Sequence, residues 1–250
     1  MKKTLCAVIL VGAFILASCG TLEQIGIGGG GVEEELGLQE IQPEPTEAVL
    51  AEGAFYREEF EKDINQDWGL KVVSGLEKQL IWDQSNGRLR LQTLGPNDIN
   101  FLFLNKRNTY KDVIVQANVE NLGQLDNAFS LICRANENGW YEFRISSEGY
   151  YELLRFDQYK YDEGKNAYTN FLGKRVGSTK INSGLDTNTF SLSCEGNLII
   201  PFINGEQPYW EKRPLAIEDD TFREGTIGFG FAGYGAVLDA AYNWVEAIKP

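Results

Sequence analysis

The sequence contains no histidine among its 250 residues. This absence excludes Ser-His-Asp triads, histidine-ligated zinc or iron, and an imidazole general base. Catalysis by this chain would have to use carboxylates, tyrosine, lysine or arginine. No catalytic residue, metal ligand or cofactor is assigned from the sequence, and the composition favours a binding function over an enzymatic one.

Positive charge is also scarce, with 23 Lys and Arg against 36 Asp and Glu, a net charge of −13 and a pI near 4.6. Such a surface repels phosphate backbones, which argues against nucleic acid as a partner. A hydrophobic content of 43% indicates a globular protein. Helical periodicity is absent, and 27 glycines together with alternating patterns favour an all-β domain.

The apolar run at the N-terminus, Leu5–Leu16, is too short for an ordinary transmembrane helix. Two lysines precede it and small residues follow, so residues 1–18 are predicted to be a secretory signal peptide. Residues 16–20 (Leu-Ala-Ser-Cys-Gly) resemble a bacterial lipobox. The resemblance implies cleavage before Cys19 and lipidation of its sulfur with fatty acyl chains such as palmitate. The expected location is extracytoplasmic, on the cell membrane or the outer membrane; an ordinary signal peptide is the alternative.

Residues 19–52 form an acidic segment that contains Gly and Pro. From residue 20 it has eight Glu and no Lys or Arg, with a run of four glycines and two prolines. It shows no sustained periodicity, so it is predicted to be a disordered tether that holds the following domain, 53–250, away from a membrane.

The sequence has four cysteines. The predicted cleavage removes Cys6 with the signal peptide, and the predicted lipidation uses Cys19. Cys133 and Cys194 are then the two cysteines that can form a disulfide. An oxidising compartment would allow these two to pair. A disulfide that closes the loop between Cys133 and Cys194 would stabilise the folded domain by about 4 kcal/mol. Two buried free thiols are the alternative.

Apolar and polar residues alternate in two stretches at the centre of the domain. Residues 127–156 predict three antiparallel strands with tight turns at Asn-Glu-Asn-Gly and Ser-Glu-Gly, and residues 188–205 predict a further hairpin. Each stretch has one cysteine on its apolar phase. Turn signals every 8–12 residues predict a two-sheet sandwich or jelly roll. The other predicted strands are 55–60, 69–73, 79–82, 88–92, 100–104, 113–120, 170–176, 226–232 and 236–248.

An ordered set of landmarks runs through residues 55–248. They are Asp67-Trp68, Asn86-Gly87-Arg88-Leu89, Lys111-Asp112-Val113, Ile132-Cys133-Arg134, Trp140-Tyr141-Glu142-Phe143, Gly149-Tyr150-Tyr151, Cys194-Glu195-Gly196-Asn197, Ile203-Asn204-Gly205 and Gly225-Thr226-Ile227-Gly228. The set resembles the concanavalin A-like lectin/glucanase superfamily, and more narrowly laminin G-like and 3-keto-disaccharide-hydrolase-like domains. The resemblance implies a jelly-roll sandwich of two antiparallel sheets. Tyr242-Asn243 departs from the Asp-Asn pair common on the last strand, which puts a calcium ligand there in doubt.

The resemblance also implies that sugars lie on a concave face formed by the central strands. The candidate ligand-binding residues there are Arg134, Trp140, Glu142, Arg144, Tyr150 and Glu152, which supply planar hydrogen-bonding groups and aromatic rings. The alternative is a ladder of ion pairs, Arg134 with Glu142 and Arg144 with Glu152. Glu142 and Glu152 could also form a glycosidase pair, but the Glu-x-Asp-x-x-Glu motif of related glucanases is missing.

Two further features leave alternatives open. Tyr159, Tyr161 and Tyr168 lie in the connection 157–169, where they would either be exposed for recognition or fold back over the sandwich. Asp219-Asp220 could ligate a structural calcium or simply be solvated. Three functions follow: a surface domain that binds glycan or another ligand, a 3-keto-disaccharide-type hydrolase, and a protein-interaction domain without a sugar site.

Overall fold

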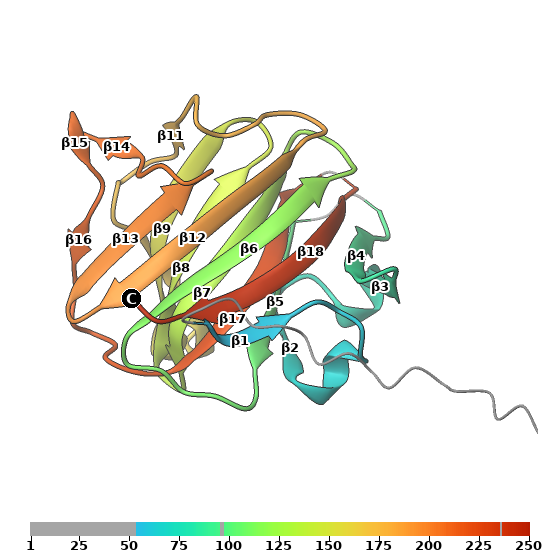
Figure 1. Cartoon of the computed structure of the whole chain (residues 1–250), viewed down its shortest axis with the longest axis horizontal. Helices are drawn as coiled ribbons and strands as arrows, with labels where there is room; N and C mark the ends of the chain where they lie inside the picture. The colour runs from blue at the N-terminus through green and yellow to red at the C-terminus, as the bar shows by residue number, and fades with distance from the viewer. Residues whose placement is uncertain (1–53, 96–97, 236) are drawn as a thin grey trace, which may run out of the picture. The chain divides into compact units, whose positions relative to one another are not determined.

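The computed structural model describes residues 54–95, 98–235 and 237–250. In this part of the chain two antiparallel sheets, each of eight strands, stack on one another (Figure 1). The predicted all-β jelly-roll sandwich is therefore confirmed. The predictions of a signal peptide at 1–18, a tether at 19–52 and lipidation of Cys19 lie outside the described residues.

One sheet, called the β6 sheet, is built around a long central strand. Its order is β16 (Ile217–Glu218), β13 (Leu198–Ile203), β12 (Thr187–Glu195), β6 (Val113–Asn121), β18 (Asp239–Ile248), β4 (Arg88–Thr93) and β3 (Leu80–Ser85), with β1 (Ala54–Glu58) also paired to β18. The two ends of the domain therefore meet in this sheet, because β1 and β18 are neighbours (Figure 1).

The second sheet, called the β8 sheet, contains the central meander. Its order is β10 (Tyr168–Asn170), β9 (Tyr150–Asp157), β8 (Gly139–Ser146), β7 (Asn127–Asn136), β17 (Thr226–Tyr234), β5 (Asp98–Asn105) and β2 (Trp68–Ser74), with β11 (Val176–Gly177) also paired to β9. The remaining elements are the hairpin β14 (Tyr209–Trp210) and β15 (Arg213–Pro214), the helix α1 (Gln158–Asp162) and the 3-10 turns η1 (Ile64–Gln66) and η2 (Glu77–Gln79).

Strand alternation explains how the sheets stack. Val113, Val115 and Val119 of β6 are fully buried, as are Phe129 and Leu131 of β7 in the facing sheet. Successive residues of a strand point to opposite faces, so one apolar phase from each sheet fills the space between them. Burying each such side chain contributes about 1.5–3 kcal/mol, which makes this interior the main source of stability.

A disulfide joins the two sheets through that interior. Cys133 of β7 and Cys194 of β12 are bonded, with Cα atoms 6.6 Å apart and no exposed surface. Both cysteines lie on the apolar phase, as the alternation predicted. The predicted pairing is confirmed, and the alternative of two free thiols is wrong.

The predicted strands differ from the observed ones mainly in the connections. The strand predicted at 170–176 is instead two short strands, β10 and β11, which both pair with β9. The last strand begins at Asp239. The connection after β9 contains α1, whose first turn is capped by the Asp157 carboxylate accepting from Lys160 N at 3.0 Å.

Candidate functional site

A buried carboxylate lies on the outer face of the β8 sheet, the face turned away from the β6 sheet. Glu142 of β8 has no exposed surface. Its Oε1 accepts hydrogen bonds from Ser130 Oγ at 2.6 Å and from Nε and Nη2 of Arg144 at 3.0 and 2.5 Å. Its Oε2 accepts from Trp140 Nε1 at 3.1 Å and from Tyr168 Oη at 2.9 Å. The period-two pattern of β8 places Trp140, Glu142 and Arg144 on one face.

The surroundings of Glu142 keep its carboxyl group ionised. Burial opposes ionisation, but the charge of Arg144 and the hydrogen bonds described above outweigh this effect and hold the pKa of Glu142 below its ordinary value. The general acid of a glycosidase needs a raised pKa. Glu142 is therefore suited to accepting hydrogen bonds and unsuited to donating a proton.

Residues 158–168, called the strap, cross the outer face of the β8 sheet from β9 toward β2. Tyr161 Oη donates to the carbonyl of Val73 at 3.1 Å, and Lys71 Nζ donates to Gln158 Oε1 at 3.1 Å. Val73 and Lys71 belong to β2, which is separated from β9 by four strands in the sheet order. The strap therefore bridges strands at opposite sides of the sheet and covers part of its outer face.

The tyrosines of the strap were expected either to be exposed for recognition or to fold back over the sandwich. Tyr161 and Tyr168 fold back, with ring centroids 5.5 and 5.0 Å from that of Phe156. Tyr159 is 71% exposed. The interpretation of folded-back rings therefore holds for two of the three tyrosines.

Arg134 lies apart from the other candidate residues. A β-bulge shifts the β7–β8 register between Cys133 and Asn136, and Arg134 has a φ of 54° at this bulge. A bulge re-aims the side chain that it carries. The buried guanidinium donates to the carbonyls of Lys111 at 2.9 Å and Phe222 at 3.2 Å.

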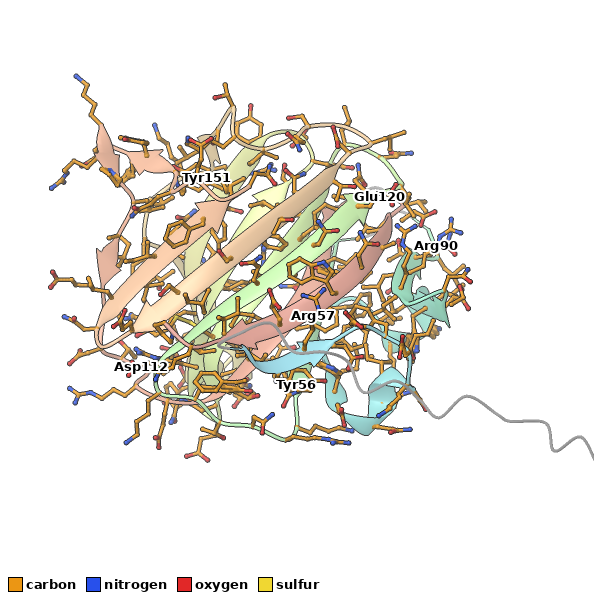
Figure 2. The ribbon with its side chains drawn as sticks, in the orientation of Figure 1. Tyr56, Arg57, Arg90, Asp112, Glu120 and Tyr151 are labelled. Atoms are coloured by element: carbon orange, nitrogen blue, oxygen red, sulfur yellow. A yellow bond between two sulfur atoms is a disulfide. The ribbon has the colours of Figure 1, made fainter. Side chains whose placement is uncertain are left out.

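The expected ion pair between Arg134 and Glu142 is wrong, because the bulge directs the Arg134 side chain elsewhere. The ion-pair partner of Arg134 is Asp112, at 3.4 Å. Asp112 lies just before β6 (Figure 2). Glu142 pairs instead with Arg144 of its own strand, at 2.5 Å. The predicted ladder of cross-strand ion pairs therefore does not describe the arrangement of Arg134 and Glu142.

Trp140 is buried, which differs from its expected place beside an open sugar site. Its ring stacks on that of Phe156 at 3.8 Å and 8°, and it is 1% exposed. Leu102, Ile132 and Ala167 complete a small apolar cluster around this pair. As placed, the Trp140 ring offers no open face to a sugar, and its indole N–H serves Glu142.

A groove of about 500 Å³ remains open beside the strap. Its lining includes Arg144 and Glu152 from the candidate set, together with Asn100, Tyr168 and Asn170. Glu152 lies opposite Arg144 in the β8–β9 register, and its Oε1 accepts from Asn170 Nδ2 at 3.0 Å. Amide and carboxylate groups with tyrosine edges are suited to recognising hydroxyl groups.

Tyr150, the sixth candidate, lies at the start of β9 and is 42% exposed. The Arg175 guanidinium lies 5.1 Å from the centre of its ring, which is within cation–π distance. Tyr150 does not contribute to the lining of the groove. The ligand-binding role of all six candidates stays a prediction, which the groove favours for Arg144 and Glu152.

Comparison with known proteins identifies the fold. No protein-family model matches the sequence, and no curated protein matches it. A Bacillus licheniformis β-glucanase matches with a TM-score of 0.53 at 14% identity, over 78% of this chain and 98% of its own. The laminarinase catalytic domain of Thermotoga maritima matches with a TM-score of 0.55 at 8% identity, over 79% and 98%. Carbohydrate-binding module CBM66 of Bacillus subtilis has a TM-score of 0.49 at 12% identity, over 69% and 92%.

The domain has the concanavalin A-like jelly-roll fold. At these identities the similarity establishes the architecture alone, so the chemistry of the site rests on the residues of this chain.

Asn100 and Asn170 of this jelly roll are not among the site residues that the sequence predicts. Asn100 is polar, yet it lies in β5 (Asp98–Asn105), whose other interior positions are apolar, and it is only 5% exposed. A single amide inside an apolar strand was the signal that could have identified it. Asn170 follows the strap, and no pattern in the sequence connects it with Glu152.

The two neighbouring aspartates have different surroundings. Asp219 Oδ1 accepts from Tyr141 Oη at 2.5 Å and from Thr221 N at 2.9 Å, while Oδ2 pairs with Arg155 at 2.6 Å. Asp220 pairs with Arg223 at the surface. The Asp219 carboxylate is thus committed to protein donors. Within the described ranges no group of three or more Cys, Asp or Glu side chains is arranged to hold a metal ion.

Among the described residues, no helix is long and apolar enough to cross a bilayer.

Proposed function

We propose that this chain is a lipid-anchored extracytoplasmic protein whose jelly-roll domain binds carbohydrate in the groove beside the strap. The observation that carries the proposal is the lining of the groove, which brings Glu152 and Asn170 together with Arg144 and Tyr168. Sugar recognition needs such planar polar groups together with aromatic surface. The names of two structural neighbours, a β-glucanase and a laminarinase, make glucans the first ligands to test.

The chemistry of the site favours binding over hydrolysis. Glycoside hydrolysis uses one carboxyl group as a proton donor and a second as base or nucleophile. Glu142 is held ionised by buried donors, and Glu152 accepts a hydrogen bond from Asn170. Glu142 is therefore unsuited to the role of proton donor, so we favour a lectin-like role for this site.

The first test measures glycan binding by the full-length protein in mild detergent, first on a glycan array and then by calorimetry. Replacing both Glu152 and Asn170 by alanine is expected to weaken binding at least tenfold, because two hydrogen-bonding side chains are lost at about 3- to 10-fold each. Tyr159→Ala is the matched control, since this exposed side chain of the strap lies outside the groove lining. Unchanged affinity in the double variant would place the sugar site elsewhere.

The anchoring part of the proposal rests on Cys19 and on the disulfide. Disulfides persist in oxidising compartments, so the Cys133–Cys194 bond supports export from the cytoplasm. Several acyl chains on one cysteine give stable membrane attachment without a transmembrane helix.

Replacing Cys19 by serine is expected to move the protein from the membrane fraction to the soluble fraction and to abolish incorporation of labelled palmitate. Cys6→Ser is the matched control, because this residue belongs to the predicted signal peptide and should leave anchoring intact. Membrane retention of the Cys19 variant would contradict a lipid anchor at that position.

A further inference from the structure

The strap closes one side of the groove. Trp140 and Glu142 are buried behind it, and Tyr161 Oη of the strap donates to the carbonyl of Val73 at 3.1 Å. Tyr161 and Tyr168 line the groove on this side. A ligand longer than the groove cannot continue beneath this cover, so it would extend in the other direction, toward the beginning of β9.

Beyond Glu152, the outer face of β9 leads to Tyr150. One residue separates the two along the strand, so their side chains lie on the same face, with about 7 Å between them. On the neighbouring strand β8, Ile145 lies opposite Tyr151. Ser146, the next residue of β8, therefore lies beside Tyr150 on the outer face, and its short side chain does not separate Tyr150 from Glu152.

The ring of Tyr150 is both accessible and held in place. The residue keeps 42% of its surface exposed. Its neighbour across the β9–β11 pair is Gly177, which has no side chain to cover the ring. The Arg175 guanidinium lies 5.1 Å from the ring centre, and this cation–π contact restrains the ring. Tyr150 therefore presents an aromatic surface next to the polar groove.

A polar groove with an aromatic ring beside it matches the chemistry of an oligosaccharide. The hydroxyl groups of a sugar unit need hydrogen-bonding partners such as Glu152 and Asn170, which line the groove. The C–H face of a pyranose ring is apolar and packs on an aromatic side chain. One sugar unit in the groove and a second unit on Tyr150 would satisfy both requirements within a single chain.

We propose that Tyr150 forms a second sugar subsite, which lies beyond the groove on the side away from the strap and stacks on the C–H face of one pyranose unit. The ligand is then an oligosaccharide that fills the groove and reaches Tyr150, and the affinity rises when the chain is long enough to cover that ring. This inference rests on the proposed function, because a sugar in the groove brings the next unit to Tyr150.

The test compares chain lengths by calorimetry on the full-length protein in mild detergent. The probes are two pairs of β-linked glucose oligomers, cellobiose with cellotetraose and laminaribiose with laminaritetraose. In each pair the disaccharide occupies the groove, and the tetrasaccharide also reaches Tyr150. For the pair that binds, the wild-type protein is expected to bind the tetrasaccharide about 3- to 10-fold more tightly than the disaccharide, as expected for one stacked ring.

The variants locate this gain in affinity. Tyr150→Ala should weaken binding of the tetrasaccharide about 3- to 10-fold and leave the disaccharide unchanged, which a general loss of structure would not do. Tyr150→Phe keeps the ring and should behave as wild type with both lengths. Tyr159→Ala is the matched control, because this exposed tyrosine lies on the strap, beyond the opposite end of β9.

Several outcomes would overturn the subsite. Equal affinity of the wild-type protein for both lengths would do so without any variant. An equal loss for both lengths in Tyr150→Ala would assign the ring a structural role, such as covering Gly177. Unchanged tetrasaccharide binding in Tyr150→Ala, or a selective loss in Tyr159→Ala, would place the longer chain elsewhere. Absence of binding to every probe by the wild-type protein would reject the sugar site itself, and this result is distinct from the others, in which a sugar still binds.

Discussion

Removing the bond between Cys133 and Cys194 is expected to lower the free energy of unfolding by about 4 kcal/mol. The bond closes a loop with a sequence separation of 61 residues and joins β7 of one sheet to β12 of the other. In the unfolded chain it restricts this long loop, and in the folded chain it fixes the two sheets together. Urea unfolding of a Cys133→Ala, Cys194→Ala variant, followed by tyrosine and tryptophan fluorescence, measures the difference.

Reduction of the wild-type protein provides the control for this prediction. Dithiothreitol should bring the wild-type unfolding midpoint close to that of the double alanine variant and leave the variant unchanged. The slope of unfolding against urea should rise when the bond is absent, because the unfolded chain becomes less compact. A difference below about 1 kcal/mol between oxidised and reduced protein would show that sheet packing alone fixes the fold.

The architecture could be predicted because local pattern and global packing agree. In β6, the apolar residues Val113, Val115, Ala117 and Val119 at every second position define the face that must be buried, and a shift of one residue would expose all of them. The same logic placed Cys133 and Cys194 on apolar phases of different stretches. Two residues that both face the interior of a two-layer domain can meet, and here they do.

The candidate site was harder to predict because the alternation of apolar and polar residues in a strand does not show which segment covers the outer face of the sheet. Trp140 and Glu142 lie on the phase expected to be open, and they are buried by the strap. The strap has no periodicity, and its attachment depends on long-range contacts such as Tyr161 with the carbonyl of Val73. Arg134 was misplaced for a different reason, since one bulge residue changes the direction of a side chain.

Two residues that line the groove could not be predicted from the sequence. Asn100 belongs to β5 and Asn170 to β10, and neither sequence neighbourhood indicates that both border one groove. What joins them is the order of strands in the β8 sheet together with the path of the strap. These depend on contacts between residues far apart in the sequence, which a pattern of a few residues cannot specify.

Glu142 provides the second large expected effect. Replacing it by glutamine should lower the free energy of unfolding at pH 7 by about 3–5 kcal/mol, because the buried guanidinium of Arg144 would lose the compensating charge of Glu142. The matched control is Glu148→Gln, which removes the surface carboxylate paired with Arg175 at 3.2 Å. Exposed pairs contribute little, so that change should stay within about 1 kcal/mol.

The effect of the Glu142 substitution should also depend on pH with a defined sign. The folded-state pKa of Glu142 lies below its ordinary value of 4.5, so its stabilising contribution is fully present above about pH 4.5. The contribution is lost as the pH falls through the folded-state pKa, because the folded carboxylate must then bind a proton. The difference in unfolding free energy between wild type and Glu142→Gln should therefore be constant from pH 8 to pH 5 and narrow in more acidic solution. A difference that widened on acidification would mean that Glu142 is protonated in the folded protein.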